Sequence, residues 1–288
     1  MRSVRRRLLI AAVILFTFGL GVALGSGPLN RPADVLPGMD APSTSADAGT
    51  TAFETTYINK TGGDVLDDRL KGHAVAIISA AGAEPAQVDV VAQGLKMAGA
   101  TVVGRFGFTE KLTDPGNRQF ADGVARQSAL KVKSVADGED SYDRVGAALV
   151  RALIGKVGDS PDDVAETIWS AFDGGGLVSG DAPEKYGDTV VVIAGPQRKA
   201  SESTVVAELT RAIDAGTKGT VLAGPSESSL TGGAVAELRE DGDEAKVSTV
   251  DVTNSAAGGV LVARALTRDV AGKPGAWGTP RSSDGALP

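Results

Sequence analysis

The stretch that decides the fold is HAVAIISAAGAEPAQVDVVAQGLKMAGATVVGRF, residues 73–106. It opens with a short apolar run rich in β-branched side chains, which is typical of a strand buried on both faces. Val88, Val91 and Leu95 then recur at the spacing of one helix face. A second strand-like run, TVVGRF, closes the stretch. Strand, helix and strand in this order predict two parallel strands joined by a crossover helix.

The same alternation continues to about residue 277. Strand-like runs recur at residues 189–193, 220–222 and 247–252, and helices are expected from residues 114, 141, 160, 203 and 255. In the helix that begins at Asp114, Phe120 and Val124 are expected to face inward. Strands that are apolar on both faces and separated by helices indicate a parallel sheet covered on both sides. We therefore predict an α/β three-layer sandwich with a mainly parallel sheet, Rossmann-like or flavodoxin-like.

A basic segment and a long apolar run precede this body. Residues 1–7 contain four arginines and no acid, and residues 8–25, LLIAAVILFTFGLGVALG, are 18 uncharged residues. As a helix this run is about 27 Å long, close to the hydrocarbon thickness of a bilayer. By the positive-inside rule, residues 1–7 stay in the cytoplasm and the chain after the run lies outside it. The sequence thus predicts a single-pass anchor in the cell membrane. The residues that set its topology are Arg2, Arg5, Arg6 and Arg7.

A cleaved signal peptide is the alternative interpretation of the same segment. Ala23-Leu24-Gly25 resembles a cleavage site, although 18 apolar residues exceed the usual length and favour retention. In a retained helix, Gly21 and Gly25 have the small-xxx-small spacing that lets two membrane helices approach closely. They are candidates for helix pairing with a second copy or a partner, although glycine is common in membrane helices without such a role.

Composition divides the rest of the chain. Residues 26–56 are rich in Pro, Ser, Thr, Ala, Asp and Gly, and such a segment buries too little apolar surface to offset its ordering entropy. We expect a flexible, disordered tether there. Residues 57–277 are long enough for one extracytoplasmic domain with a substantial core. Residues 278–288 are expected to form a disordered tail.

The composition excludes several classes of function. The chain has no cysteine, so zinc fingers, iron–sulfur clusters and thiol catalysis are ruled out. Its net charge of −7 and pI of about 4.9 argue against nucleic-acid binding. No G-x-G-x-x-G follows the first strand, and neither a phosphate-binding P-loop nor a G-x-S-x-G nucleophile elbow is present. We expect no catalytic residues and no enzyme activity.

Metal ligands are scarce. His73 is the single histidine, at the start of the first expected strand, where a structural role is expected. Met39 falls in the expected tether and Met97 on the first expected helix. Copper(I) prefers several converging thiolate or thioether ligands, which these residues do not provide. The acidic residues between 240 and 244 are typical of a solvated turn. The residues therefore predict no metal site and no cofactor.

Three expected strands end in similar turns that contain Gly82, Gly195 and Gly224. In open α/β sheets, ligands bind beyond the carboxyl ends of the strands, so these turns would line any crevice. Glycine also occurs in such turns simply because it lets a strand turn into a helix. Both interpretations remain open from sequence.

Four short segments recur as a set along the chain: GVALGS at residues 21–26, LKGHAVAII at 70–78, VSTVD at 247–251 and GAWGT at 275–279. Together they resemble the actinobacterial copper transport protein B (MctB) family. The resemblance covers most of the chain, in order. It implies an envelope protein with a single anchor, associated with copper homeostasis and efflux, and members are also described as outer-membrane proteins. Copper enters as a ligand only through this resemblance.

The resemblance also implies an alternative function. Related corynebacterial proteins are linked to cell separation through an extracytoplasmic coiled coil that engages a peptidoglycan hydrolase. The present chain departs from them because residues 26–56 show no sustained heptad repeat, which puts that contact in doubt. We expect as partners the membrane and either another envelope protein or a second copy, and no nucleic acid. The alternative function is that of a non-catalytic envelope scaffold.

Overall fold

The residues that the computed structural model describes are 45–196, 199–240, 247–279 and 283–288. Gly49–Pro288 form one compact unit. The predicted anchor at residues 8–25, with Gly21 and Gly25, and the four arginines before it all lie outside the described residues. None of the helices in the described part of the chain is long and apolar enough to cross a bilayer.

The sheet has seven strands in the order β3-β2-β1-β4-β5-β6-β7. All neighbouring strands pair in parallel except β2 and β3, which are antiparallel. The prediction of a mainly parallel α/β sheet is confirmed. The strands are β1 (Ala74–Ser79), β2 (Thr101–Phe108), β3 (Val178–Ser179), β4 (Thr189–Ile193), β5 (Thr220–Ala223), β6 (Ser248–Val250) and β7 (Ala276–Trp277).

The strand order distinguishes between the two predicted arrangements. The full order begins 3-2-1-4-5-6, as in a Rossmann fold, but β3 has two residues and runs antiparallel to β2. The parallel strands β2-β1-β4-β5-β6 have the flavodoxin-like order 2-1-3-4-5. The order reverses between β1 and β4, because the chain runs outward to β2 on one side and outward through β5 and β6 on the other. In such sheets this reversal is where a crevice for ligands forms.

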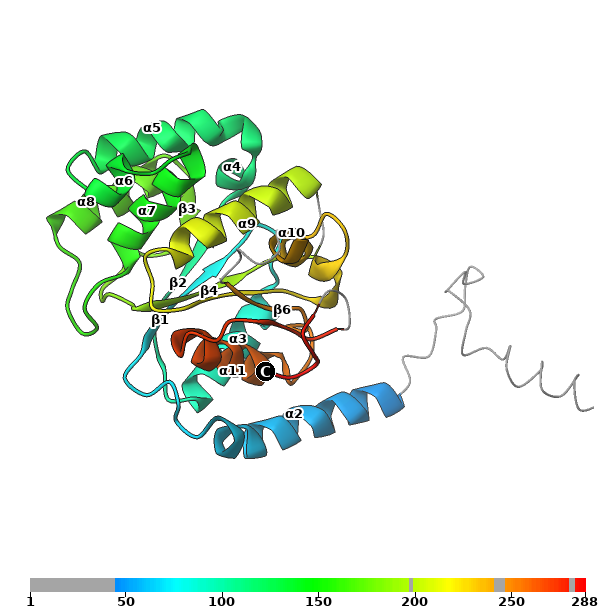
Figure 1. Cartoon of the computed structure of the whole chain (residues 1–288). Helices are drawn as coiled ribbons and strands as arrows, with labels where there is room; N and C mark the ends of the chain where they lie inside the picture. The colour runs from blue at the N-terminus through cyan, green and yellow to red at the C-terminus, as the bar shows by residue number, and fades with distance from the viewer. Residues whose placement is uncertain (1–44, 197–198, 241–246, 280–282) are drawn as a thin grey trace, which may run out of the picture. The chain divides into compact units, whose positions relative to one another are not determined.

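Helices cover both faces of the sheet (Figure 1). One face packs against α2, α3 and α11, and the other against the larger set α4 to α10. The helices are α2 (Ser45–Leu66), α3 (Pro85–Met97), α4 (Glu110–Thr113), α5 (Arg118–Ser128), α6 (Lys133–Ala136), α7 (Ser141–Leu153), α8 (Asp163–Gly174), α9 (Ala200–Asp214), α10 (Ala234–Glu240) and α11 (Gly258–Val270). Two 3-10 turns, η2 (Pro115–Asn117) and η3 (Ser226–Ser229), complete the described elements.

Each central strand supplies both apolar layers because its side chains alternate between faces. In β1, Ala76 and Ile78 lie in the core under α7 and α9, whereas Val75 and Ile77 lie in the core under α3 and α11. The α3–α11 contact is close because Gly94 and Gly259 face each other without side chains, and a Cβ on either would collide with the partner backbone.

The outer helices begin at side-chain caps. Asp140 accepts hydrogen bonds from the backbone amides of Tyr142 and Asp143, which forms a capping box at the start of α7. Asp162 accepts from the amide of Ala165 and caps the start of α8 with this single hydrogen bond.

The structure corrects the prediction of a flexible tether over residues 26–56. Residues 45–56 form the first half of α2, and the preceding part lies outside the described residues. Leu66 is buried and Ile58 packs against the core formed by α3 and α11, so the second half of the helix is anchored to the body. Helix extension from an existing turn is far easier than nucleation, which explains how a segment with poor helix propensity becomes helical.

The predicted disordered tail is also corrected in its described parts. Gly278 and Thr279 continue from β7 against β6, and the amide of Thr279 donates a 2.8 Å hydrogen bond to Asp251. Further on, the amide of Asp284 donates to the carbonyl of Ala276 at 2.8 Å. Side-chain and backbone partners on the sheet thus hold this segment, and its composition did not reveal them.

Candidate functional site

The candidate crevice lies where β1 and β4 end, at the reversal of strand order. Gly82 has a positive φ of 89°, which glycine adopts without strain. Gly195 follows β4, and a Cβ added to it would lie 2.6 Å from the carbonyl carbon of Gly82. The two turns therefore meet backbone against backbone, and glycine at position 195 is required by this contact.

Little space remains beside this contact. A cavity of about 20 Å³ is bordered by Ala80, Thr113, Gly195 and Ser203, among others. This volume holds about one water molecule. Glu202 also borders it, from the first turn of α9. The geometry therefore offers a small polar niche at the reversal point, and a substrate-sized ligand would require the turns to move.

Gly224 lies at the end of β5 and is covered in a different way. A Cβ added to Gly224 would collide with the side chain of Ser228. Ser228 is fully buried, and its hydroxyl donates a 2.6 Å hydrogen bond to the carbonyl of Pro225. The three predicted glycines thus lie along the carboxyl edge of the sheet, each at the end of a different strand.

A buried ion pair follows at the end of β6. Nη1 of Arg239, on α10, lies 3.3 Å from Oδ2 of Asp251, and the two side chains are 3% and 0% exposed. Arg239 also donates to the hydroxyl of Thr249 at 2.9 Å and to the carbonyl of Trp277 at 3.1 Å. Asp251 accepts from both the amide and the hydroxyl of Thr279. Burial lowers the pKa of Arg239, an effect opposed by Asp251.

This ion pair attaches the last strand to the sheet. Its partners belong to α10, β6 and the segment after β7, so the contact joins three parts of the chain that are separate in sequence. A Cβ on Gly278, whose φ is 125°, would collide with the Asp251 carboxylate. The ion pair therefore acts as a structural clamp, because it holds these three parts of the chain together.

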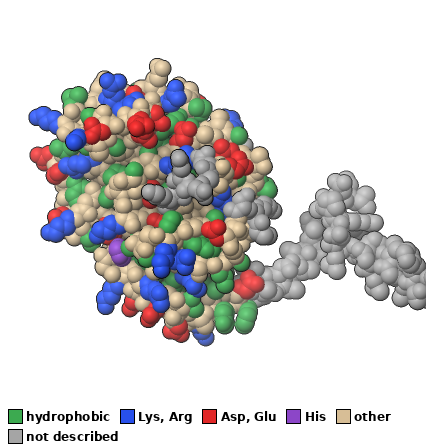
Figure 2. Space-filling model, viewed as in Figure 1, with side chains coloured by type: hydrophobic (Ala, Val, Ile, Leu, Met, Phe, Trp, Pro, Cys, Tyr) green, Lys and Arg blue, Asp and Glu red, His purple; other side chains and the backbone are tan. Residues whose placement is uncertain are grey.

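The opposite, amino edge of the sheet has its own carboxylates. Asp188, directly before β4, accepts a 2.8 Å hydrogen bond from the amide of Ala74. Its other oxygen lies 2.9 Å from Nδ1 of His73 and 3.2 Å from Nζ of Lys218. Asp188 is buried, whereas part of the imidazole reaches the surface (Figure 2). The single histidine therefore helps to close the amino edge, as its position at the start of β1 predicts.

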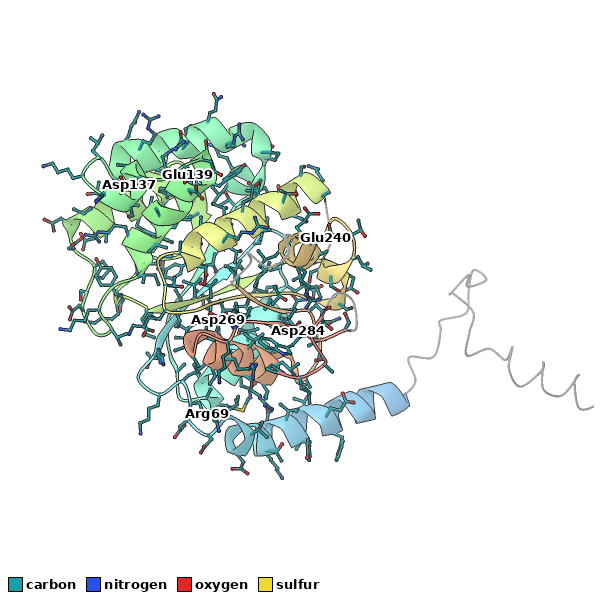
Figure 3. The ribbon with its side chains drawn as sticks, viewed as in Figure 1. Arg69, Asp137, Glu139, Glu240, Asp269 and Asp284 are labelled. Carbon is teal, nitrogen blue, oxygen red and sulfur yellow. The ribbon has the colours of Figure 1, made fainter. Side chains whose placement is uncertain are left out.

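Asp269 lies near the end of α11 and is labelled in Figure 3. Its carboxylate accepts hydrogen bonds at the start of two strands. It accepts from the amide of Thr220 at 3.0 Å and from the amide and hydroxyl of Ser248 at 3.0 and 2.5 Å. Burial raises the pKa of Asp269, and these hydrogen bonds oppose the rise. Asp188 and Asp269 thus satisfy backbone donors that open strand ends would leave unpaired.

The described part of the chain contains few side chains that could bind copper. Within the described ranges, no three His, Cys, Asp or Glu side chains are grouped to hold a metal ion. His73 contacts Asp188, and Met97 packs beside Gly62 in the layer formed by α2, α3 and α11. The acidic residues that follow Glu240, for which the sequence predicts a turn, lie outside the described residues.

A family model described as copper transport outer membrane protein, MctB, matches residues 1–288, the whole chain. The chain belongs to this family. The predicted resemblance is confirmed, and copper transport is the class of function that the family description gives. A search of curated proteins found no match.

The sequence did not predict the ion pair of Arg239 and Asp251 or the hydrogen bonds of Asp269. Asp251 lies within the strand predicted for residues 247–252, and its charge was the one signal of a special position there. A carboxylate at the end of a strand that is apolar on both faces needs a buried partner. Arg239 is that partner, but the pairing of α10 with β6 could not be deduced from local patterns.

Proposed function

We propose that this chain is a single-pass protein of the cell envelope that lowers the copper load of the cell through contact with another protein. In this proposal it has neither a high-affinity copper site nor a catalytic centre of its own. The observation that carries the proposal is membership of a copper transport family in a chain that has so few copper ligands.

The ligand supply supports an indirect role. Copper(I) is held by several converging sulfur or imidazole donors. The chain has no cysteine, one histidine and three methionines. Nδ1 of the histidine lies 2.9 Å from Asp188, and Met97 packs in an apolar layer. Both side chains thus have structural contacts that explain their presence without a metal.

The filled carboxyl edge supports a non-catalytic role. The site where flavodoxin-like sheets bind ligands contains a cavity of about 20 Å³, which is far smaller than the usual ligand pocket. A protein that binds other proteins uses the outside of its helices instead. The outer helical layers are therefore the surfaces to test first.

The test measures cell-associated copper during copper stress in a strain that lacks the gene. Re-expression of the full chain should lower the accumulated copper, and His73→Gln and Met97→Leu variants should do so equally well. Unchanged copper after deletion would rule out the transport role. Failure of the His73→Gln and Met97→Leu variants, with normal expression and folding, would instead point to direct metal handling.

The topology is tested separately. A reporter that is active only outside the cytoplasm, fused after Pro288, should be active, because the arginines before the apolar run stay inside. Sequencing of the mature amino terminus should recover the residues of the run. A mature chain that begins at Ser26 would show that the segment is a signal peptide and would contradict the anchor.

One observation favours a second candidate function, that of an envelope scaffold in cell separation or hydrolase regulation. The helix α2 follows the predicted anchor, in the region where related proteins carry a coiled coil. Phe53 and Tyr57 are 68% and 56% exposed on it, and their rings stack with centroids 6.2 Å apart. Exposed aromatic pairs of this kind are typical of protein contact surfaces.

The scaffold role is tested by cross-linking in living cells. Because the chain has no cysteine, Tyr57→Cys introduces a single reactive position. It should capture a defined envelope protein, whereas Thr55→Cys, about 200° away around the helix, should not. Equal capture at both positions, or capture of bulk proteins alone, would argue against a specific contact through α2.

A further inference from the structure

The segment from the end of α5 to the start of α7 has an uneven charge distribution. Residues 126–136 contain three basic side chains and no acid, and residues 137–143 contain four acids and no base. Asp137 and Glu139 lie at the turn between α6 and α7, in the outer helical layer (Figure 3). Opposite charges therefore lie next to each other on one exposed surface, which we name the α5–α7 patch.

The basic half of this patch carries a protruding apolar side chain. Leu130 is 81% exposed, the highest value among the large hydrophobic residues that the structure describes. It borders an open hollow of about 660 Å³ together with Arg126 and Arg144. Arg144 bonds to Asp122 at 2.5 Å, whereas the Arg126 side chain is 68% exposed. Lys131, next to Leu130, is also exposed.

The acidic half carries a hollow with a partly apolar lining. Its volume is about 370 Å³, and its rim includes Asp137, Glu139 and Asp143. Its apolar lining consists of small residues and one valine, from α7 and from the end of α9. These are Ala147, Val150, Ala212, Ala215 and Gly216. An apolar side chain flanked by basic residues would match both the apolar lining and the rim.

We propose that the α5–α7 patch binds a second copy of this chain across a two-fold axis. Leu130 of each copy enters the acidic hollow of the other, and Arg126 and Lys131 approach the acidic rim. A two-fold interface needs a surface that is complementary to itself, so that each contact occurs twice. The patch meets this requirement because the protruding leucine and the matching hollow lie on adjacent, oppositely charged halves.

Charge complementarity favours a second copy over an unrelated protein. A foreign basic segment would satisfy the acidic hollow and leave Leu130 and the basic half exposed. A second copy satisfies both halves at once. Opposite charges across an interface also fix its register and disfavour other orientations. This surface is separate from α2, so it does not depend on the proposed function.

Disulfide cross-linking of the full-length chain in its membrane tests the contact. Two differently tagged copies are co-expressed, one with Leu130→Cys and the other with Ala215→Cys, and both positions are exposed enough for the fold to tolerate the change. Oxidation should link the two copies. Copies that both carry Leu130→Cys should link much less, because a two-fold axis places the two leucines apart. Leu287→Cys, which replaces a residue that is 66% exposed, is the matched control for Leu130→Cys.

Charge reversal then tests the register. Glu139→Lys or Lys131→Glu alone should lower the cross-linked fraction about tenfold, and the double variant should restore it. Filling the hollow with Ala215→Tyr, in chains without the cysteine at 215, should lower the dimeric fraction measured by mass in detergent. Cross-linking no better than the Leu287→Cys control would overturn the proposal. Capture of a different protein at Ala215→Cys, or insensitivity to charge reversal, would overturn it as well.

Discussion

At the amino edge of the sheet, Asp188 and Asp269 accept hydrogen bonds from the first amides of three strands, whereas at the carboxyl edge Gly195 lies directly against Gly82. The amino edge is thus closed by side chains that reach in from α11 and from the residue before β4. The carboxyl edge is closed by backbone contacts and, further along, by the ion pair of Arg239 and Asp251.

The difference matters because the two edges usually have different tasks. In open α/β sheets the carboxyl edge holds the ligand, and the amino edge serves stability. Among the residues that the structure describes, side chains and backbone contacts cover both edges, and a cavity of about 20 Å³ lies beside the turns that follow β1 and β4. The surfaces open to a partner are therefore those of the helices, where α2 and the α5–α7 patch lie.

The largest effect is expected at the ion pair of the carboxyl edge. Asp251→Ala leaves Arg239 buried without its carboxylate and frees the segment after β7. We expect a loss of about 3–5 kcal/mol of unfolding free energy, measured by denaturant titration. Asp284→Ala removes an exposed carboxylate that accepts from the amide of Ala276, and should cost much less. Equal losses in the two variants would show that Asp251 is not a clamp.

The next effect concerns the backbone contact at the reversal point. Gly195→Ala places a methyl group 2.6 Å from the carbonyl carbon of Gly82, where backbone rather than a flexible side chain must give way. We expect a loss of about 1–3 kcal/mol. Gly123→Ala, in α5 with no atom near the added carbon, should instead stabilise the protein by about 0.5–1 kcal/mol. A neutral Gly195→Ala would mean that the turns separate easily, as a ligand site requires.

The two edges were unequally predictable from sequence. The five longer strands followed from apolar runs such as AVAII, and so did the carboxyl-edge position of the glycines, but the two-residue strands β3 and β7 were not predicted. The choice between Rossmann-like and flavodoxin-like order did not follow, because it depends on the strand that pairs with the outer side of β2, and this strand is the two-residue antiparallel β3. The contacts that cover the strand ends, such as those of Asp269 and of the Arg239–Asp251 pair, could not be predicted either, because they join elements that are distant in sequence.

Two predictions about helices were also wrong because tertiary contacts overrode local patterns. Phe120 was expected to face inward, and this was wrong, because the ring is 44% exposed and lies 4.2 Å from Nζ of Lys111. Helical spacing places an aromatic residue on a face, but a nearby cation can hold it at the surface. In the same way, composition predicted a tether where the anchored end of α2 extends the helix.

The third effect is a pH dependence at the amino edge. Burial raises the pKa of Asp269 in the folded protein above its value in the unfolded chain. The folded state therefore binds more protons between the two values, and stability falls as the pH rises through that window. Below the unfolded value both states are protonated, and this contribution is fully present.

Asp269→Asn removes the titration. At acid pH the variant should be less stable by about 1–2 kcal/mol, because the amide nitrogen cannot accept the bonds of Ser248. The difference between wild type and variant should shrink as the pH rises through the window. Denaturant titrations across acid to neutral pH measure this change. A difference that grows with pH would contradict the raised pKa.

The smallest effect is expected at the exposed member of the other amino-edge cluster. Nζ of Lys218 lies 3.2 Å from Asp188, and the lysine side chain is 65% exposed, so solvent screens much of the attraction. Lys218→Ala should cost at most about 0.5 kcal/mol, and added salt should reduce even that. Asp188→Ala should cost about 1–3 kcal/mol, and most of this loss should persist in added salt, because it leaves the amide of Ala74 buried without its acceptor. Salt distinguishes the two kinds of contact at the amino edge. The stability contributed by a carboxylate that caps backbone amides should depend little on salt, whereas that of an exposed ion pair should fall as salt is added. A loss in Lys218→Ala as large as that in Asp188→Ala would mean that charge pairing, rather than amide capping, closes the amino edge.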